Sequence, residues 1–108
     1  MDEHDFRRKY DAAIDLLRRR LLELGDEHGF EVEGQEKLDL LFEEPEEARF
    51  VISPNTPVRQ IWISALTTSF KLDWSDKANA FVLEKTGETL SQLMGRILTQ
   101  QLGNPVAV

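Results

Sequence analysis

The chain has 108 residues, of which 41% are hydrophobic and 31% are charged, so we expect one domain with one hydrophobic core. Its 20 acidic and 13 basic side chains give a net charge of -7, which argues against nucleic acid or an anionic membrane as partner. Cations or basic protein surfaces fit this charge better. The absence of cysteine excludes disulfides, thiolate nucleophiles and thiolate-held zinc or iron–sulfur clusters.

The negative charge is concentrated in the first half of the chain. Residues 1–47 carry 16 acidic and 7 basic side chains, whereas residues 48–108 carry 4 and 6. The chain begins with acidic residues, and no apolar run approaches the ~18–20 residues of a membrane span. We therefore expect a cytoplasmic protein, although a mature protein that had lost an organellar presequence would look the same.

An amphipathic helix is predicted for the first 24 residues, because apolar side chains recur there every three or four positions. Gly25 is expected to end this helix. The opposite face carries acids and arginines, among them Asp15, Arg18 and Arg19. The apolar stripe consists of Phe6, Tyr10, Ala13, Ile14, Leu17, Leu21 and Leu24.

From Phe30 onward the apolar period changes from helical to two, which is typical of strands with one face on a core. An acidic turn at Glu43–Glu47 and a proline-containing break at Pro54–Pro57 separate some of these strands. Six strands are predicted, at about 30–33, 38–43, 48–53, 58–65, 70–74 and 80–85.

A second amphipathic helix follows the strands. Thr89 and Gln92 fit a capping box at its start, and Gly103 is expected to end it. Both helices have a single apolar stripe and the strands alternate. The pattern therefore predicts an α+β fold, a two-layer α/β sandwich with two helices packed on one face of a mostly antiparallel sheet of about six strands. Residues 1–108 would form this single domain.

One strand places an aromatic side chain on the uncovered face of the sheet. If Ile61 and Ile63 face the helices, then Gln60, Trp62 and Ser64 point the other way. An exposed tryptophan is a residue type that dominates protein interfaces. It can equally serve only to cover the neighbouring strands, and the pattern leaves both interpretations open.

No motif for nucleophilic catalysis, phosphate binding or zinc binding is present, and the two histidines lie in polar segments. What remains is a set of carboxylates around residues 23–33, which suits hard cations in open, weak sites. A solvated face that keeps the protein soluble is the alternative interpretation. The carboxylates are Glu23, Asp26, Glu27, Glu31 and Glu33.

The segment Val51–Ser64, with its Thr-Pro turn followed by Gln-Ile-Trp-Ile-Ser, resembles the hallmark segment of the frataxin family. Asp73-Trp74 looks like the family's fifth strand, and residues 87–90 and 99–103 look like the last helix of the bacterial, CyaY-type branch. Asp5, Phe6 and Asp11 match the first helix. The resemblance covers the whole chain with almost no gaps.

The resemblance implies a role in iron–sulfur cluster assembly. A ferroxidase activity is sometimes ascribed to the family, but the sequence shows no preorganised ligand set for a redox enzyme, so we expect no catalysis. The resemblance also implies weak binding of Fe²⁺ or Fe³⁺ on an acidic ridge, and docking on the cysteine desulfurase and its scaffold protein, by a protein that is monomeric without iron. Carried over by position, the ridge comprises Asp11, Glu23, Asp26, Glu27, Glu31 and Glu33. The partner face comprises Gln60 and Trp62, with Lys71 where relatives often have a basic residue.

The sequence departs from the family pattern in the first helix. Arg18, Arg19 and Leu22 stand where bacterial relatives usually carry acids, so the negative charge concentrates on residues 23–33. The Glu43–Glu47 turn is more acidic than the pattern needs and could form a second, weaker patch that attracts cations. These departures keep an alternative open, an acidic protein-interaction module that regulates a basic partner without binding metal.

Overall fold

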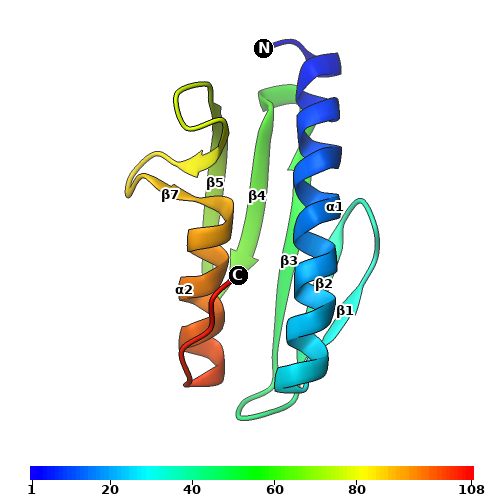
Figure 1. Ribbon diagram of the computed structural model, residues 1–108, viewed down its shortest axis with the longest axis vertical. Coiled ribbons are helices and arrows are strands. Elements are labelled where there is room, and N and C mark those ends of the chain that lie inside the picture. The colour runs from blue at the N-terminus through cyan, green and yellow to red at the C-terminus, as the bar shows by residue number, and fades with distance from the viewer.

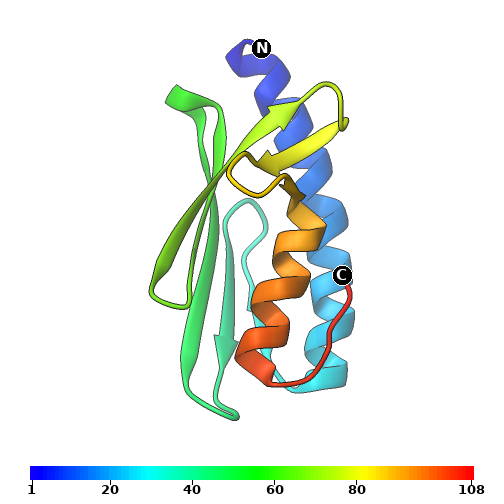
Figure 2. The ribbon, with the colours of Figure 1, turned by 90° about the vertical axis from the view of Figure 1, so that its left-hand side faces the viewer.

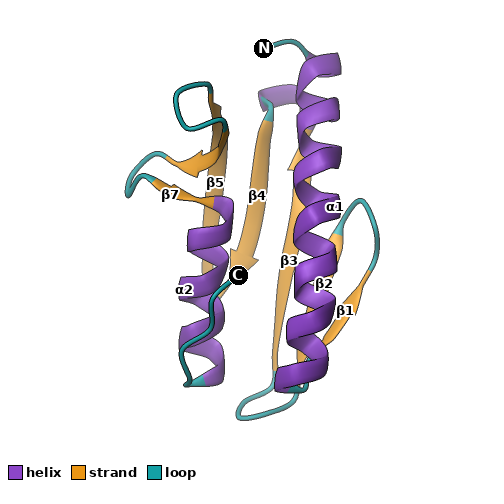
Figure 3. Cartoon of the chain, in the orientation of Figure 1, coloured by secondary structure: helices purple, strands orange, loops and turns teal.

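The computed structural model describes residues 1–108 and shows two helices packed on one face of a single antiparallel sheet (Figures 1 and 2). The sheet order is β1-β2-β3-β4-β5-β6-β7, so each strand pairs with its neighbours along the chain (Figure 3). The elements are α1 (Glu3–His28), β1 (Glu31–Glu33), β2 (Leu38–Phe42), β3 (Ala48–Asn55), the 3₁₀ turn η1 (Thr56–Val58), β4 (Gln60–Ala65), β5 (Thr68–Ser75), β6 (Ala80–Leu83), β7 (Glu88–Thr89) and α2 (Leu90–Leu102). The predicted α+β sandwich is confirmed, with seven strands in place of six.

Helix α1 is longer than its sequence pattern predicts. The Asp2 carboxylate caps its start by accepting a hydrogen bond from the Asp5 amide. The helix ends at Gly29, whose φ of 81° is the left-handed conformation of many helix C-caps. The prediction that Gly25 ends the helix is therefore wrong.

Gly25 lies inside α1 because the chain folds back tightly against it. A Cβ atom at this position would lie 2.5 Å from the Phe30 carbonyl oxygen. The Gly25 carbonyl accepts hydrogen bonds from the amides of both Gly29 and Phe30. This close approach directs the chain from the end of α1 into β1.

Several strand boundaries differ from the prediction; β5, for example, spans Thr68–Ser75 where residues 70–74 were expected. Strand β3 continues through Pro54, which pairs with Ile61, and β4 begins only at Gln60 because η1 precedes it. Arg59 makes the turn into β4 with a φ of 56°. Strand β6 ends at Leu83 where the pattern predicts Lys85.

Strand β7 was not predicted, because two residues are too few to show an alternating pattern. Glu88 pairs with Leu83 and Thr89 pairs with Val82, which extends the sheet to the start of α2. The predicted capping box is confirmed, since the side chains of Thr89 and Gln92 each bond the backbone N–H of the other.

The core lies between the helices and the sheet and contains only apolar side chains and Tyr10. Ile61 and Ile63 are buried, whereas the side chain of Trp62 between them is 38% exposed. The predicted two faces of β4 are confirmed. Neither helix is both long enough and apolar enough to cross a membrane.

Candidate functional site

The five carboxylates of residues 23–33 line one side of the molecule, on the last turns of α1 and on β1. All five are exposed, and α1 and β1 contact each other along this side (Figure 1). Their negative charges therefore add up to a negative electrostatic potential over this side of the molecule. We call this set the acidic strip; its members are Glu23, Asp26, Glu27, Glu31 and Glu33.

The acidic strip is a surface and does not form a preformed metal cage. The structure contains no group of three or more acidic or histidine side chains arranged to hold a metal ion. A cation could meet one or two carboxylates here and would keep much of its water shell. Such a site suits weak and exchangeable binding.

Asp11, the remaining predicted ridge residue, lies apart from the acidic strip. It precedes Glu23 by three helical turns, or ~18 Å along α1. Its carboxylate lies 3.6 Å from the Arg7 guanidinium, which neutralises part of its charge. The structure therefore does not bring Asp11 together with the other five residues.

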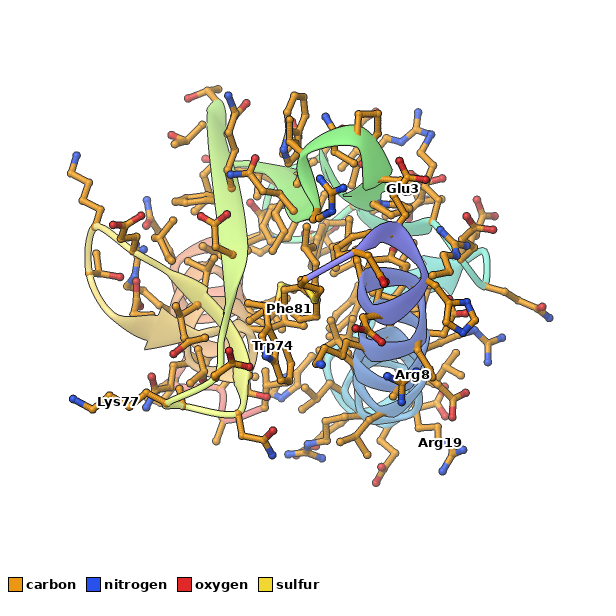
Figure 4. All side chains as sticks on the ribbon, turned by 90° about the horizontal axis from the view of Figure 1, so that it is seen from above. Glu3, Arg8, Arg19, Trp74, Lys77 and Phe81 are labelled. Atoms are coloured by element: carbon orange, nitrogen blue, oxygen red, sulfur yellow. The ribbon has the colours of Figure 1, made fainter.

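The arginines of α1 have separate roles that the sequence did not distinguish. The Arg18 Nε atom donates a hydrogen bond of 2.9 Å to the Gly34 carbonyl, which fastens the β1–β2 loop to the helix. Arg19 pairs with Asp15, and its side chain points away from the body of the protein (Figure 4). Arg20 lies 4.0 Å from Glu23, the one ion pair that reaches the acidic strip.

Tyr10 of α1 also holds the β1–β2 loop against the helix. Its hydroxyl donates a hydrogen bond to the Glu36 carbonyl, and Arg7 pairs with the Glu36 carboxylate. Burial raises the pKa of the Tyr10 phenol, so the hydroxyl keeps its proton and remains a donor. The loop that follows the acidic strip is thus held to α1 at three points.

The predicted partner-binding residues come together on the open face of the sheet. Trp62 pairs directly with Lys71 of β5, and the Lys71 ammonium lies 4.7 Å from the centre of the indole ring. The Trp62 indole N–H donates a 2.9 Å hydrogen bond to the Gln60 side-chain oxygen. We call Gln60, Trp62, Lys71 and Asp73 the sheet-face cluster.

Asp73 belongs to this cluster although the sequence did not mark it as a binding residue. It pairs with Gln60 across β4 and β5, and the Gln60 amide donates a 3.1 Å hydrogen bond to its carboxylate. The sequence signal that could have identified Asp73 is the turn between β4 and β5, because the position of the turn fixes which residues of the two strands face each other. Gln60 thereby holds the indole of Trp62 in one orientation.

The Glu43–Glu47 turn connects β2 and β3 at one end of the sheet (Figure 1). Its four glutamates are exposed, and none of them forms an ion pair. The turn contacts α2 through the Glu46 carbonyl, which accepts a hydrogen bond from the Gln101 amide. It is a separate acidic patch.

The family model described as "Frataxin-like domain" matches residues 1–104. The chain belongs to the frataxin family. The predicted resemblance is thereby confirmed over nearly the whole length of the sequence.

Curated relatives and a solved structure agree with the frataxin assignment. The chain is 25% identical over 96 residues to the iron–sulfur cluster assembly protein CyaY of Pseudomonas putida strain GB-1, which covers 88% of this chain and 87% of the relative. The protein of the same name from Azotobacter vinelandii is 21% identical, with the same coverage. The frataxin from Psychromonas ingrahamii has the same fold, with a TM-score of 0.73, 18% identity, and coverage of 99% of this chain and 97% of its own.

Proposed function

We propose that this protein is an iron-binding accessory protein of iron–sulfur cluster assembly. It binds Fe²⁺ or Fe³⁺ weakly on the acidic strip and docks on a cysteine desulfurase and its scaffold protein, as an iron donor or a regulator. Membership of the frataxin family and the similarity to iron–sulfur cluster assembly proteins named CyaY support this role. The observation that carries it is the exposed acidic strip on α1 and β1.

Charge and exposure support the two uses of the acidic strip. Four of its five carboxylates make no ion pair within the chain, so they are free for a cation or for basic side chains of a partner. Because the same groups serve both, iron and the desulfurase compete or cooperate at this surface.

The sheet-face cluster supports contact with the scaffold protein. Its indole is held by Gln60 and Lys71, so little side-chain freedom is lost when a partner covers it. A pre-oriented tryptophan beside a cation and a carboxylate combines an apolar anchor with polar specificity. Glu31 and Glu33 flank the core-packed Val32, so they point to the same open face of the sheet as Trp62, and a partner on this face can reach part of the acidic strip as well.

The proposed role is not enzymatic. Oxidation of iron by this protein would need ligands held in a fixed geometry around the metal, and the acidic strip has no such set. We propose the bacterial cytoplasm as the location, as for a CyaY-type protein. The isolated protein is expected to be a monomer without iron.

An anaerobic Fe²⁺ titration followed by NMR tests the metal part of the proposal. We expect broadening and shifts at the acidic strip, and little change elsewhere. Replacing Glu23, Glu27, Glu31 and Glu33 by Gln should abolish them. The matched control replaces Glu43, Glu44, Glu46 and Glu47 by Gln, which changes the net charge equally and should preserve the response. Equal loss in both variants would mean that only net charge matters.

An acidic interaction module without physiological metal is the second candidate function. The absence of a three-carboxylate cluster favours it. A cluster-assembly assay at varied iron concentration separates the two candidates, with the same pair of quadruple variants. Dependence of the effect on iron supports the first candidate; an effect of the acidic strip that is independent of iron supports the second.

A further inference from the structure

A mainly apolar groove lies away from the acidic strip and the sheet-face cluster. It has a volume of about 750 Å³ and runs between α1, the end of β5, β6 and the start of α2. Figure 4 shows Trp74 and Phe81 side by side next to α1, at the position of this groove. Its apolar walls include Ala13, Leu16, Leu17, Phe81, Leu90 and Val108.

The charge of this groove is opposite to that of the protein. The chain has a net charge of -7, yet no aspartate or glutamate lines the groove, and its two charged side chains are Lys9 and Arg20. Lys9 forms no ion pair and lies 5.0 Å from the centre of the Trp74 ring. Asp76 accepts a 2.8 Å hydrogen bond from the Trp74 indole N–H, so the unpaired Lys9 ammonium is the positive group that a ligand carboxylate would meet at this end.

Residues 106–108 lie at the other end of the groove. Arg20 donates a 2.9 Å hydrogen bond to the Ala107 carbonyl and lies near Glu23, so it is already engaged. Thr99 of α2 accepts a hydrogen bond from the Val106 amide, which holds the same segment from the other side. The segment passes between the two helices in Figure 1.

One apolar side chain that lines the groove is mostly exposed to solvent. Leu16 is 69% exposed, the most exposed large hydrophobic residue in the protein. A partner helix has a diameter of ~10–12 Å. An alkyl chain is much thinner, and the groove volume lies within the ~300–1,000 Å³ of small-molecule sites.

We propose that this groove binds a free fatty acid or a similar amphipathic carboxylate. The carboxylate lies at Lys9, beside Trp74, and the alkyl chain runs over Leu16 and Phe81 toward Val108. Binding uses neither the acidic strip nor the sheet-face cluster. The protein could therefore respond to an amphipathic anion while both proposed functional surfaces remain free.

Titration with decanoate, below its micelle-forming concentration, tests this inference by NMR. The chain carries its own internal control, because the Trp74 indole lies in the groove and the Trp62 indole lies on the opposite sheet face. We expect the Trp74 signal to shift and the Trp62 signal to stay. Decanol should bind more weakly than decanoate, and decyltrimethylammonium more weakly still. Vesicles of phosphatidylglycerol should leave both signals unchanged, which separates a free acid from a membrane surface.

Two pairs of variants locate the binding. Leu16→Glu should weaken decanoate binding about tenfold or more, whereas Leu22→Glu, at another exposed leucine of α1 outside the groove, should leave it unchanged. Lys9→Gln should remove the preference for decanoate over decanol, whereas Lys77→Gln should preserve it. Equal effects within either pair, shifts at Trp62, or no saturable shift at Trp74 would overturn the proposal.

Discussion

Gly25 illustrates what a single residue reveals only in three dimensions. Sequence patterns treat a glycine after an apolar stripe as a helix end, and Gly29, four residues later, has the same meaning. What distinguishes them is the position of Phe30, whose carbonyl occupies the space of a Gly25 Cβ atom. The glycine allows a close contact in one case and a left-handed turn in the other. The contact between Gly25 and Phe30 leaves no trace in the periodicity of apolar residues, so the sequence pattern cannot predict it.

Gly25→Ala is expected to destabilise the protein despite the higher helix propensity of alanine. The added methyl group would lie 2.5 Å from backbone, so α1 or the Phe30 segment must shift, at a cost of about 1–3 kcal/mol. Gly95→Ala in α2 is the matched control, because its Cβ would lie 3.2 Å from the Val106 carbonyl. Urea unfolding should show the larger loss for Gly25→Ala, and equal losses would contradict the clash.

Trp62→Ala is expected to separate binding from stability. The side chain is partly exposed and its contacts are with Gln60 and Lys71, so its removal should cost about 1 kcal/mol of unfolding free energy. Phe50→Ala, in the core, should cost about 3–5 kcal/mol. Calorimetric titration against the desulfurase–scaffold complex should show weaker binding of the Trp62 variant. Normal binding, or a loss of stability as large as that of Phe50→Ala, would argue against a docking role.

At the scale of elements, the two faces of β4 were predictable and the surroundings of β7 were not. Alternation assigned Ile61 and Trp62 to opposite faces, and the structure confirms it. Strand β7 has two residues, and side-chain hydrogen bonds from Arg96 in α2 to Glu88 add to its pairing with β6. Such a bond between distant elements depends on the tertiary fold.

The Glu88–Arg96 pair should make stability depend on pH. Arg96 donates two hydrogen bonds to the carboxylate, which hold the pKa of Glu88 below its usual 4.5, while partial burial opposes this. The contribution, about 1 kcal/mol because Arg96 is largely exposed, is complete above that usual pKa and lost as the pH falls through the lowered one.

Glu88→Gln is therefore expected to be less stable than the original protein near neutral pH. The difference should shrink below about pH 4 as Glu88 of the original protein becomes protonated. Urea unfolding at several pH values measures it, and Glu84→Gln, at an exposed glutamate without an ion pair, is the control. A difference in unfolding free energy that stayed constant with pH would show that the charge of Glu88 does not contribute to stability.

For the whole molecule, the excess of negative charge opposes folding and should make stability depend on salt. Raising sodium chloride from about 0.01 M to about 0.15 M shortens the range of repulsion from roughly 30 Å to roughly 8 Å, so the unfolding free energy should rise. Replacing the four glutamates of Glu43–Glu47 by Gln should reduce this rise, since none forms an ion pair. Denaturation curves at both salt concentrations measure the effect, and a fall in stability with salt would contradict it.

The sequence predicted which segments carry the candidate sites better than it predicted which residues lie together in each site. The end of α1 and β1 carry the acidic strip as expected, because both are adjacent in the chain. Asp11 was grouped with them by position alone, and the length of α1 separates it. The groove beside Trp74 was missed entirely, since its walls come from both ends of the chain and only the fold brings them together.

The sheet ends in very short strands on both sides: β1 has three residues and β7 has two. Long unpaired strand edges invite other chains to add to a sheet, and such short ones offer little to pair with. The two outermost strands therefore offer little backbone for another chain to pair with. The longer free edge is inside the order, at residues 68–72 of β5, which pair with β4 and not with β6. Growth of the sheet by a further strand would have to begin there, beside α2 and not at either end of the sheet.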